Sequence, residues 1–563
     1  MKAFRWSTVL ALAAVTVVAA VLVTGAGAGR GADQLGKINH VVVIYEENHS
    51  FDNLYGGWEG VNGRASADAA HTTQVSQAGL AMPCLLQDDV NLALISMGSC
   101  TAPSGFPNTW FTIDNFIPAT AKTCPPTLLA FSPAFSNGVL NGDPRGLPGG
   151  CTRDIVHRFY QEQFQLDNGK QDRYVIGSDA VGLTMGVYDT KALPIYKYLH
   201  DSGAPHYAIA DDFFQAAFGG SFLQHQWLVA AATPTWPGAP ATQHALLDAN
   251  GFPNATYPLY HPATTVRDGA ATQACGLSTT VAGYACGDFA VNTTQPAYQP
   301  SGAFGAKLPP QTNPTIGDRL NKAGVDWGWY SGGWSNANGD VNAPGWTNGS
   351  GPTCSDPNAD PIVSSYPRCP NNLFQYHHQP FNYYAAFDPS TADGLANRRA
   401  HLKDEQEFIQ ATQASSGACA LKPVSFVKPI GQENEHPGYA SEPNGSDHLV
   451  ALLQAIENSS CAKDTMVVVT YDEFGGQWDH VSPPGQGGTP GPHDQWGPGT
   501  RIPTLIVSPF LRGNEVVDHT QYDTTSILAT IEARWNLAPL GSRDAAVNNL
   551  SNVFAAKQYE AAK

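Results

Sequence analysis

The sequence predicts an α/β fold in which helices flank a central, mostly parallel sheet. Residues 41–44 are all β-branched and apolar, which is typical of a strand buried on both faces. Residues 465–470 repeat this pattern far along the chain. Residues 194–200 have the spacing of a helix with Pro near its start, and they lead to a short apolar strand at 207–210. Buried strands and a helix-to-strand unit together indicate the α/β class.

Polar side chains follow both of the long predicted strands. Glu47 and Asn48 come after the first strand, and Asp472 and Glu473 come after the second. Because ligands bind beyond the carboxyl ends of parallel strands, we expect these four residues to converge. Crowded carboxylates repel one another unless a hard divalent cation lies between them. The sequence therefore predicts one metal site, and its oxygen ligands favour calcium, magnesium or manganese over zinc.

Ser221 is the candidate nucleophile. It follows Gly219 and Gly220 at a sharp turn and opens a predicted helix. The positive end of the helix dipole would suit a hydroxyl that attacks a phosphate. The same spacing also fits a serine that merely caps the helix, so the pattern alone leaves both interpretations open.

Four histidines lie in polar segments that resemble loops: His157, the adjacent pair His377 and His378, and His436. Imidazolium groups can bind phosphoryl oxygens and donate a proton to a leaving alkoxide. We expect these histidines to be charged at mildly acidic pH. A lone histidine in a loop is also commonly a solvated bystander, so each is a candidate only.

Residues 1–28 predict an exported protein. Basic residues near the start precede an apolar run and a stretch of Gly and Ala, which is the pattern of a secretory signal peptide. An uncleaved membrane anchor is the alternative. In either case we expect the body of the protein in the periplasm or outside the cell.

Ten cysteines support the expectation of export, because an even count in an exported chain favours disulfides. None of them has the CxxC spacing of zinc-thiolate sites. The order of the cysteines permits local pairs, although the sequence does not fix the connectivity. These pairs are Cys84–Cys100, Cys124–Cys151, Cys275–Cys286, Cys354–Cys369 and Cys419–Cys461.

The net charge of −18 argues against nucleic acid and anionic membranes as binding partners. Residues 29–563 predict a single domain with loop-rich insertions at about 57–150 and 231–351, where Gly, Pro, Ser and Asn cluster. The later elements are predicted as helices at 398–413 and 446–458, a strand at 501–508 and a helix at 524–536, with Ser446 as the N-cap of the second helix. The sequence does not determine the oligomeric state.

Three motifs resemble the signatures of a bacterial phosphoesterase family that joins phosphatidylcholine-type phospholipases C and AcpA-type acid phosphatases. Residues 47–56 resemble its opening ENxSFDxxxG signature, and residues 472–481 and 497–503 resemble its second and third signatures. The resemblance implies an alkaline-phosphatase-like sheet. It also implies metal ligation by Glu47, Asn48, Asp472, Glu473 and Ser221, with Ser221 as nucleophile and His157, His377, His378 and His436 as residues of the phosphate pocket.

The resemblance is nearer to the acid phosphatase branch. Phospholipase members carry Thr-x-Pro-Asn-Arg at the nucleophile, whereas residues 221–225 read Ser-Phe-Leu-Gln-His. The implied function is a secreted, metal-dependent acid phosphatase of broad specificity that forms a phosphoserine and acts on small phosphate esters. The alternatives are a phospholipase C, which alone would require membrane contact, and a non-catalytic surface-binding protein on a hydrolase fold.

Overall fold

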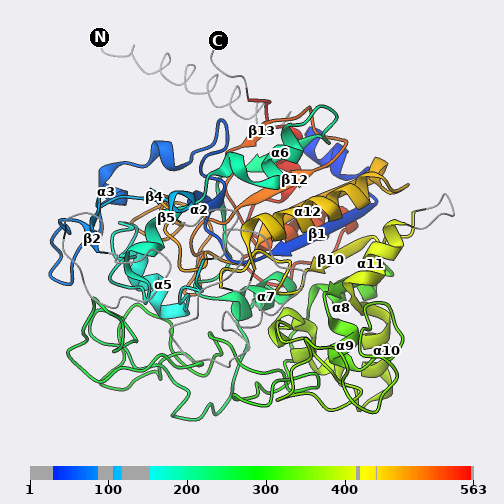
Figure 1. Ribbon diagram of the computed structural model, residues 1–563, viewed down its shortest axis with the longest axis horizontal. Helices are drawn as coiled ribbons and strands as arrows, with labels where there is room; N and C mark the ends of the chain where they lie inside the picture. The colour runs from blue at the N-terminus through cyan, green and yellow to red at the C-terminus, as the bar shows by residue number, and fades with distance from the viewer. Residues whose placement is uncertain are drawn as a thin grey trace, which may run out of the picture.

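A computed structural model describes residues 29–86, 100, 105–116, 152–413, 419–438 and 440–559. An eight-stranded sheet lies at the centre of the molecule, in the order β13-β6-β12-β11-β1-β10-β8-β9 (Figure 1). Its strands are β1 (His40–Glu46), β6 (Tyr207–Ala210), β8 (Trp327–Ser331), β9 (Leu402–Asp404), β10 (Val424–Lys428), β11 (Thr465–Tyr471), β12 (Thr504–Val507) and β13 (Val516–Asp518).

β1 forms the middle of the sheet. It pairs in parallel with β11 on one side and with β10 on the other, so that Val43 lies opposite both Val468 and Phe426. These three side chains are fully buried, as the unbroken apolar pattern of the strands predicts. Only β12 among the eight strands runs antiparallel to its neighbours. The predicted α/β class with a mostly parallel sheet is confirmed.

Helices flank the sheet in two rows. α12 (Glu442–Glu457) contacts α6 (Pro194–His200) and α11 (Glu405–Thr412), and Figure 1 shows α12 lying across the viewer's side of β1. In the second row α7 (Ser221–Ala230) contacts both α13 (Thr525–Trp535) and α8 (Ile316–Ala323). The sheet is therefore enclosed by helices, and its apolar strands form the core.

Two predicted helices differ from the structure. α12 begins at the N-cap Ser441, whose side chain accepts from the backbone N–H of Asn444; the Ser446 hydroxyl instead accepts from the backbone of Ile195. The predicted helix at 398–413 is divided, because the edge strand β9 interrupts it between α10 (Ala392–His401) and α11. Pairing of β9 with β8 outweighs the local helical pattern there.

The predicted insertion at 231–351 is shorter than expected. Residues 231–315, all of which are described, form no helix or named strand, but α8 and β8 follow directly and β8 is a strand of the sheet. The remaining short helices and strands lie outside the eight-stranded sheet. They are α2 (Phe51–Leu54), α3 (Ala69–Thr72), β2 (Leu85–Leu86), β3 (Gly105–Phe106), β4 (Phe111–Thr112), α5 (Phe159–Leu166), β5 (Gly186–Val187), β7 (Phe213–Phe214), α9 (Trp334–Asn338) and β14 (Tyr522–Asp523).

Four of the five predicted disulfides are present: Cys84–Cys100, Cys275–Cys286, Cys354–Cys369 and Cys419–Cys461. The predicted bond between Cys124 and Cys151 and the predicted signal peptide at 1–28 lie outside the described residues. Within the described part of the chain, no helix combines the length and apolar character needed to span a membrane.

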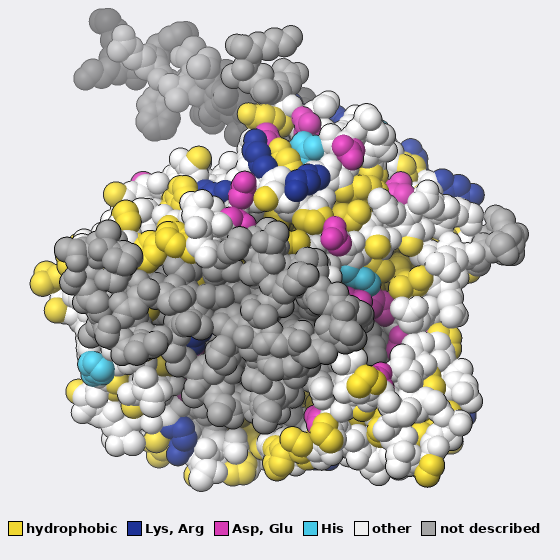
Figure 2. Space-filling model, in the orientation of Figure 1, with side chains coloured by type: hydrophobic (Ala, Val, Ile, Leu, Met, Phe, Trp, Pro, Cys, Tyr) yellow, Lys and Arg dark blue, Asp and Glu magenta, His cyan; other side chains and the backbone are white. Residues whose placement is uncertain are grey.

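Charged side chains are scattered over the face drawn in Figure 2. Lys and Arg lie there in small groups with Asp and Glu nearby, among many uncharged polar and apolar side chains. The described residues of this face therefore present no continuous basic surface, in keeping with the net charge of −18.

Candidate active site

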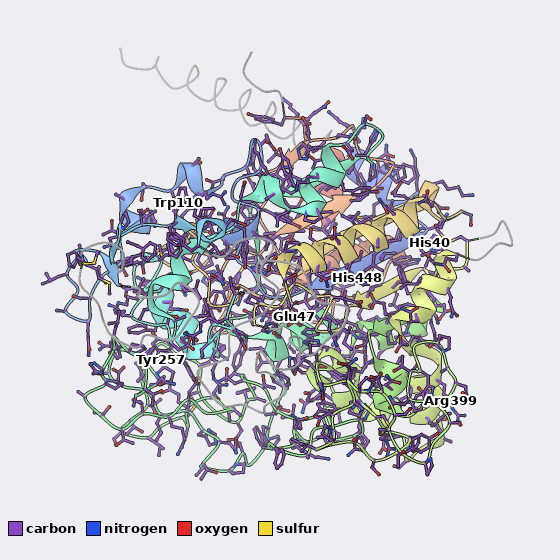
Figure 3. The ribbon with its side chains drawn as sticks, viewed as in Figure 1. His40, Glu47, Trp110, Tyr257, Arg399 and His448 are labelled. Carbon is purple, nitrogen blue, oxygen red and sulfur yellow. A yellow bond between two sulfur atoms is a disulfide. The ribbon has the colours of Figure 1, made fainter. Side chains whose placement is uncertain are left out.

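The ends of β1 and β11 bring four predicted ligands together. The parallel register places Glu46 opposite Tyr471, so the residues that follow, Glu47 with Asn48 and Asp472 with Glu473, leave adjacent strands side by side. All four side chains are fully buried. Figure 3 shows Glu47 near the middle of the molecule, where β1 ends. The register therefore places these residues at the carboxyl ends of two neighbouring strands.

Gly475 allows the two strand ends to approach each other closely. Its φ is +64°, and a Cβ atom at this position would lie 2.2 Å from the carbonyl oxygen of Asn48. A side chain would therefore meet backbone as well as require the strained left-handed conformation. The Gly-rich turn after Asp472 and Glu473 is thus a packing requirement of the site.

Ser221 lies at the edge of this carboxylate group. Its Oγ is 3.5 Å from Glu473 Oε1. Gly220 is the N-cap of α7 and Ser221 is the first helical residue, so the interpretation of Ser221 as a simple capping serine is wrong. Gly219 has a φ of +89°, and a Cβ there would lie 2.6 Å from the backbone nitrogen of Phe159. The two glycines thus let the chain turn tightly against the segment that carries His157.

Three of the predicted histidines line one cavity with Ser221. The cavity has a volume of about 640 Å³, and its lining includes His157, His377 and His436. His157 Nε2 lies 3.2 Å from Glu473 Oε1, and His436 Nε2 lies 3.8 Å from an oxygen of Glu47. A ligand in this cavity would therefore meet the Ser221 hydroxyl and the three imidazoles together.

The adjacent histidines of the 3-10 helix at 376–378 point to different neighbours. His377 lines the cavity, whereas His378 is not among its described lining residues. His378 Nε2 lies 2.5 Å from Glu47 Oε1, and its ring stacks on His225 with centroids 5.0 Å apart. His378 therefore contacts a proposed metal ligand and belongs behind the cavity wall.

Sequence reasoning missed two residues of this region. Lys428, the last residue of β10, is fully buried with its Nζ 2.6 Å from Glu47 Oε1. His225, one turn after Ser221 on α7, is also fully buried and lies 3.8 Å from Asp472 Oδ2. A charged residue that ends an apolar strand, and a histidine four residues after the nucleophile on a helix, were the available signals.

Burial and close contacts shift the pKa values of the carboxylates in opposite directions. Burial raises the pKa of Asp472 well above its usual range, and the nearby Glu47 adds to this effect. Burial and the nearby Asp472 likewise raise the pKa of Glu473 well above its usual range. Burial alone would also raise the pKa of Glu47, but His378 and Lys428 lower it well below its usual range. The site therefore contains more buried carboxylate groups than its positively charged side chains stabilise.

Burial also lowers the pKa of the cavity histidines. The pKa of His157 falls to about 4 and that of His436 to about 3. The expectation that they are charged at mildly acidic pH is wrong for the protein alone, because the imidazoles are withdrawn from water. A dianionic phosphate held among them would raise these pKa values again.

The donor set fits a hard divalent cation. Asn48 Oδ1 and both carboxylate oxygens of Asp472 are buried and accept no hydrogen bond from the described residues. Oxygen atoms left unsatisfied in this way are costly, and a cation would satisfy them. Glu47, Asn48, Asp472, Glu473 and the Ser221 hydroxyl would hold the ion.

Known proteins match this chain over limited stretches, whereas a family model matches most of its length. The model of the "Phosphoesterase family" matches residues 38–538. Non-specific phospholipase C6 of Arabidopsis thaliana is 33% identical over 145 residues, which cover 22% of this chain and 28% of the relative. Phospholipase C B of Mycobacterium tuberculosis (strain CDC 1551 / Oshkosh) is 33% identical over 158 residues, which cover 24% of this chain and 29% of the relative.

The alignments thus span less than a third of the length of these two curated relatives. Among solved structures, a protein in the alkaline phosphatase superfamily from Vibrio parahaemolyticus is 10% identical, with a TM-score of 0.28 over 65% of each chain.

Proposed function

The chain belongs to the phosphoesterase family, and on that premise we propose that it hydrolyses phosphoric esters in the cavity beside Ser221. One observation carries the proposal. A buried hydroxyl and three imidazoles line a single cavity of about 640 Å³, and Ser221 Oγ lies 3.5 Å from Glu473, beside buried oxygen atoms that have no hydrogen-bond partner in the described chain. These are the parts that phosphoryl transfer to a serine requires.

In the proposed reaction Ser221 Oγ gives up its proton to solvent and forms a bond to phosphorus while the bond from phosphorus to the ester oxygen breaks. The leaving alcohol takes a proton from an imidazole of the cavity, for which His436 is our candidate. Water then attacks the phosphoserine, which releases inorganic phosphate and restores the hydroxyl. His157 and His377 hold the phosphoryl oxygens. A divalent cation at the carboxylates would stabilise charge on those oxygens and lower the pKa of the Ser221 hydroxyl.

We take the substrate to be a soluble phosphate monoester and the protein to be an exported acid phosphatase of broad specificity. Residues 221–225 lack the phospholipase pattern, and His377 adds an imidazole to the cavity. The disulfides support export. A phospholipase C is the second candidate, because relatives named phospholipase C match this chain. The third interpretation, a binding protein without activity, gives no reason for the tight turn that places Ser221.

The test compares release of inorganic phosphate from a soluble aryl phosphate, from pH 4 to pH 9, with cleavage of phosphatidylcholine vesicles. Wild type is compared with Ser221→Ala and with Ser425→Ala, which alters a buried serine of β10 as a matched control. We expect monoester turnover on the acid side that is lost in Ser221→Ala, retained in Ser425→Ala and abolished by a chelator. Lipid cleavage without monoester turnover would favour the phospholipase. Full turnover in Ser221→Ala would refute the nucleophile.

A further inference from the structure

Lys428 is a buried cation beside the carboxylate group. β10 pairs with β1 so that Val427 lies opposite Ile44, which brings the end of β10 next to the end of β1. Lys428 Nζ donates to the carbonyl oxygen of Tyr45 at 2.8 Å and lies 2.6 Å from Glu47 Oε1. Burying an ammonium group is costly unless it is paired and hydrogen-bonded, and here both conditions are met at a proposed metal ligand.

The charge of Lys428 equals the positive charge that the site would still lack with one divalent cation bound. Glu47, Asp472 and Glu473 are three fully buried carboxylates, and a single divalent cation would supply two of the three positive charges that they need. The ammonium of Lys428 supplies the third. The loaded site would then be close to neutral, so a substrate phosphate could enter without facing uncompensated negative charge.

Lys428 also fills a place where a second cation would otherwise bind. Glu47, His225 and His378 offer donor atoms that all lie within 4.8 Å of one another. His225 Nδ1–H donates to the carbonyl oxygen of Ser221 at 2.7 Å, which leaves the lone pair on the buried Nε2 with no hydrogen-bond partner in the described chain. Such an imidazole is in the form that binds metals. The Lys428 ammonium already lies 2.6 Å from Glu47 Oε1.

We infer that Lys428 is the built-in third positive charge of the active site. It fixes Glu47, balances the carboxylate that one divalent ion leaves uncompensated, and restricts the centre to a single ion. The inference rests on the metal site of the proposed function. Lys428 acts through Glu47 and the local charge, so it is a positioning residue that does not touch the substrate.

The test measures binding, which does not require turnover. Lys428→Met keeps the length of the side chain and removes its charge. Titration calorimetry with Mn²⁺ on the metal-free protein, and with inorganic phosphate on the Mn²⁺-loaded protein, gives the two affinities. We expect wild type to bind one Mn²⁺ per chain. In Lys428→Met we expect Mn²⁺ to bind more tightly, because a repelling charge is gone, and phosphate to bind about tenfold more weakly.

The opposite pattern would overturn the inference. Weaker Mn²⁺ binding in Lys428→Met with unchanged phosphate affinity would mean that Lys428 only holds Glu47 in position. Binding of two Mn²⁺ ions per chain in wild type would refute the claim of a single ion. Lys428→Arg keeps the charge and should retain both affinities. Lys428→Gln repeats the test if the Met variant does not fold.

A matched control is Arg398→Met, which removes a buried cation that donates hydrogen bonds to residues outside the site, among them Asn382 and Asn338. It should lower thermal stability and leave both binding constants unchanged. If wild type binds Mn²⁺ and phosphate as expected but releases no phosphate from esters, the proposed function fails while the inference about Lys428 stands.

Discussion

Replacing Gly475 with Ala should damage the active site far more than the fold. The new Cβ would lie 2.2 Å from the carbonyl oxygen of Asn48, whereas ordinary contact begins near 3.4 Å. One strand end must therefore move by about 1 Å, and a displacement of that size at reacting groups costs on the order of a hundredfold in rate. The left-handed φ of +64° adds about 1–2 kcal/mol of backbone strain.

Gly488→Ala separates these two effects. Gly488 has a φ of +87°, but a Cβ there would meet nothing within 4 Å, so this variant carries the backbone strain without the collision. Turnover of an aryl phosphate at saturating Mn²⁺, and unfolding in urea, would be measured for both variants. We expect both variants to lose stability, Gly475→Ala more because of the collision, and about a hundredfold lower kcat for Gly475→Ala alone. Equal kcat values for the two variants would refute the argument from close approach.

Two further predictions concern stability. Burial alone would lower the pKa of His448, but Glu405, at 2.9 Å, and other acids raise it to about 10. The contribution of His448 is therefore complete below its ordinary pKa near 6.5 and lost as the pH rises through 10. His448→Gln should lower the free energy of unfolding by up to about 5 kcal/mol at pH 6 and by almost nothing above pH 10, measured by urea unfolding. A difference independent of pH would contradict this origin. The bond Cys419–Cys461 spans 42 residues, so its removal by paired Ala substitutions should cost about 4 kcal/mol in the same assay, and a loss below about 1 kcal/mol would contradict the loop-entropy estimate.

The sequence was sufficient to predict four strands of the sheet, β1, β6, β11 and β12, and the polar residues that follow β1 and β11. The apolar runs at 41–44 and 465–470 are strong signals because strands buried on both faces tolerate little else. Polar residues directly after such strands lie where the carboxyl ends of the strands leave the buried core. The position of Ser221 also followed from its neighbouring glycines, which mark a tight turn.

The remaining features depend on packing between distant segments. The directions of His377 and His378 are set by what the 3-10 helix packs against, and sequence spacing carries no information on that. Lys428 is recognisable as an active-site cation only once β10 is known to lie beside β1. The division of the predicted helix at 398–413 likewise arises because a strand at the sheet edge was available to pair with β9.

The central position of β1 delays assembly during synthesis. Its two partners, β10 and β11, begin at Val424 and Thr465, several hundred residues after β1 ends at Glu46. At 5–20 residues per second, a ribosome needs on the order of 20–80 s to reach β10 after completing β1. Throughout that interval the apolar strand β1 has neither neighbour, and its exposed edges invite association with other chains. A chaperone that covers residues 41–44 of the nascent chain would therefore be expected to improve the yield of folded protein.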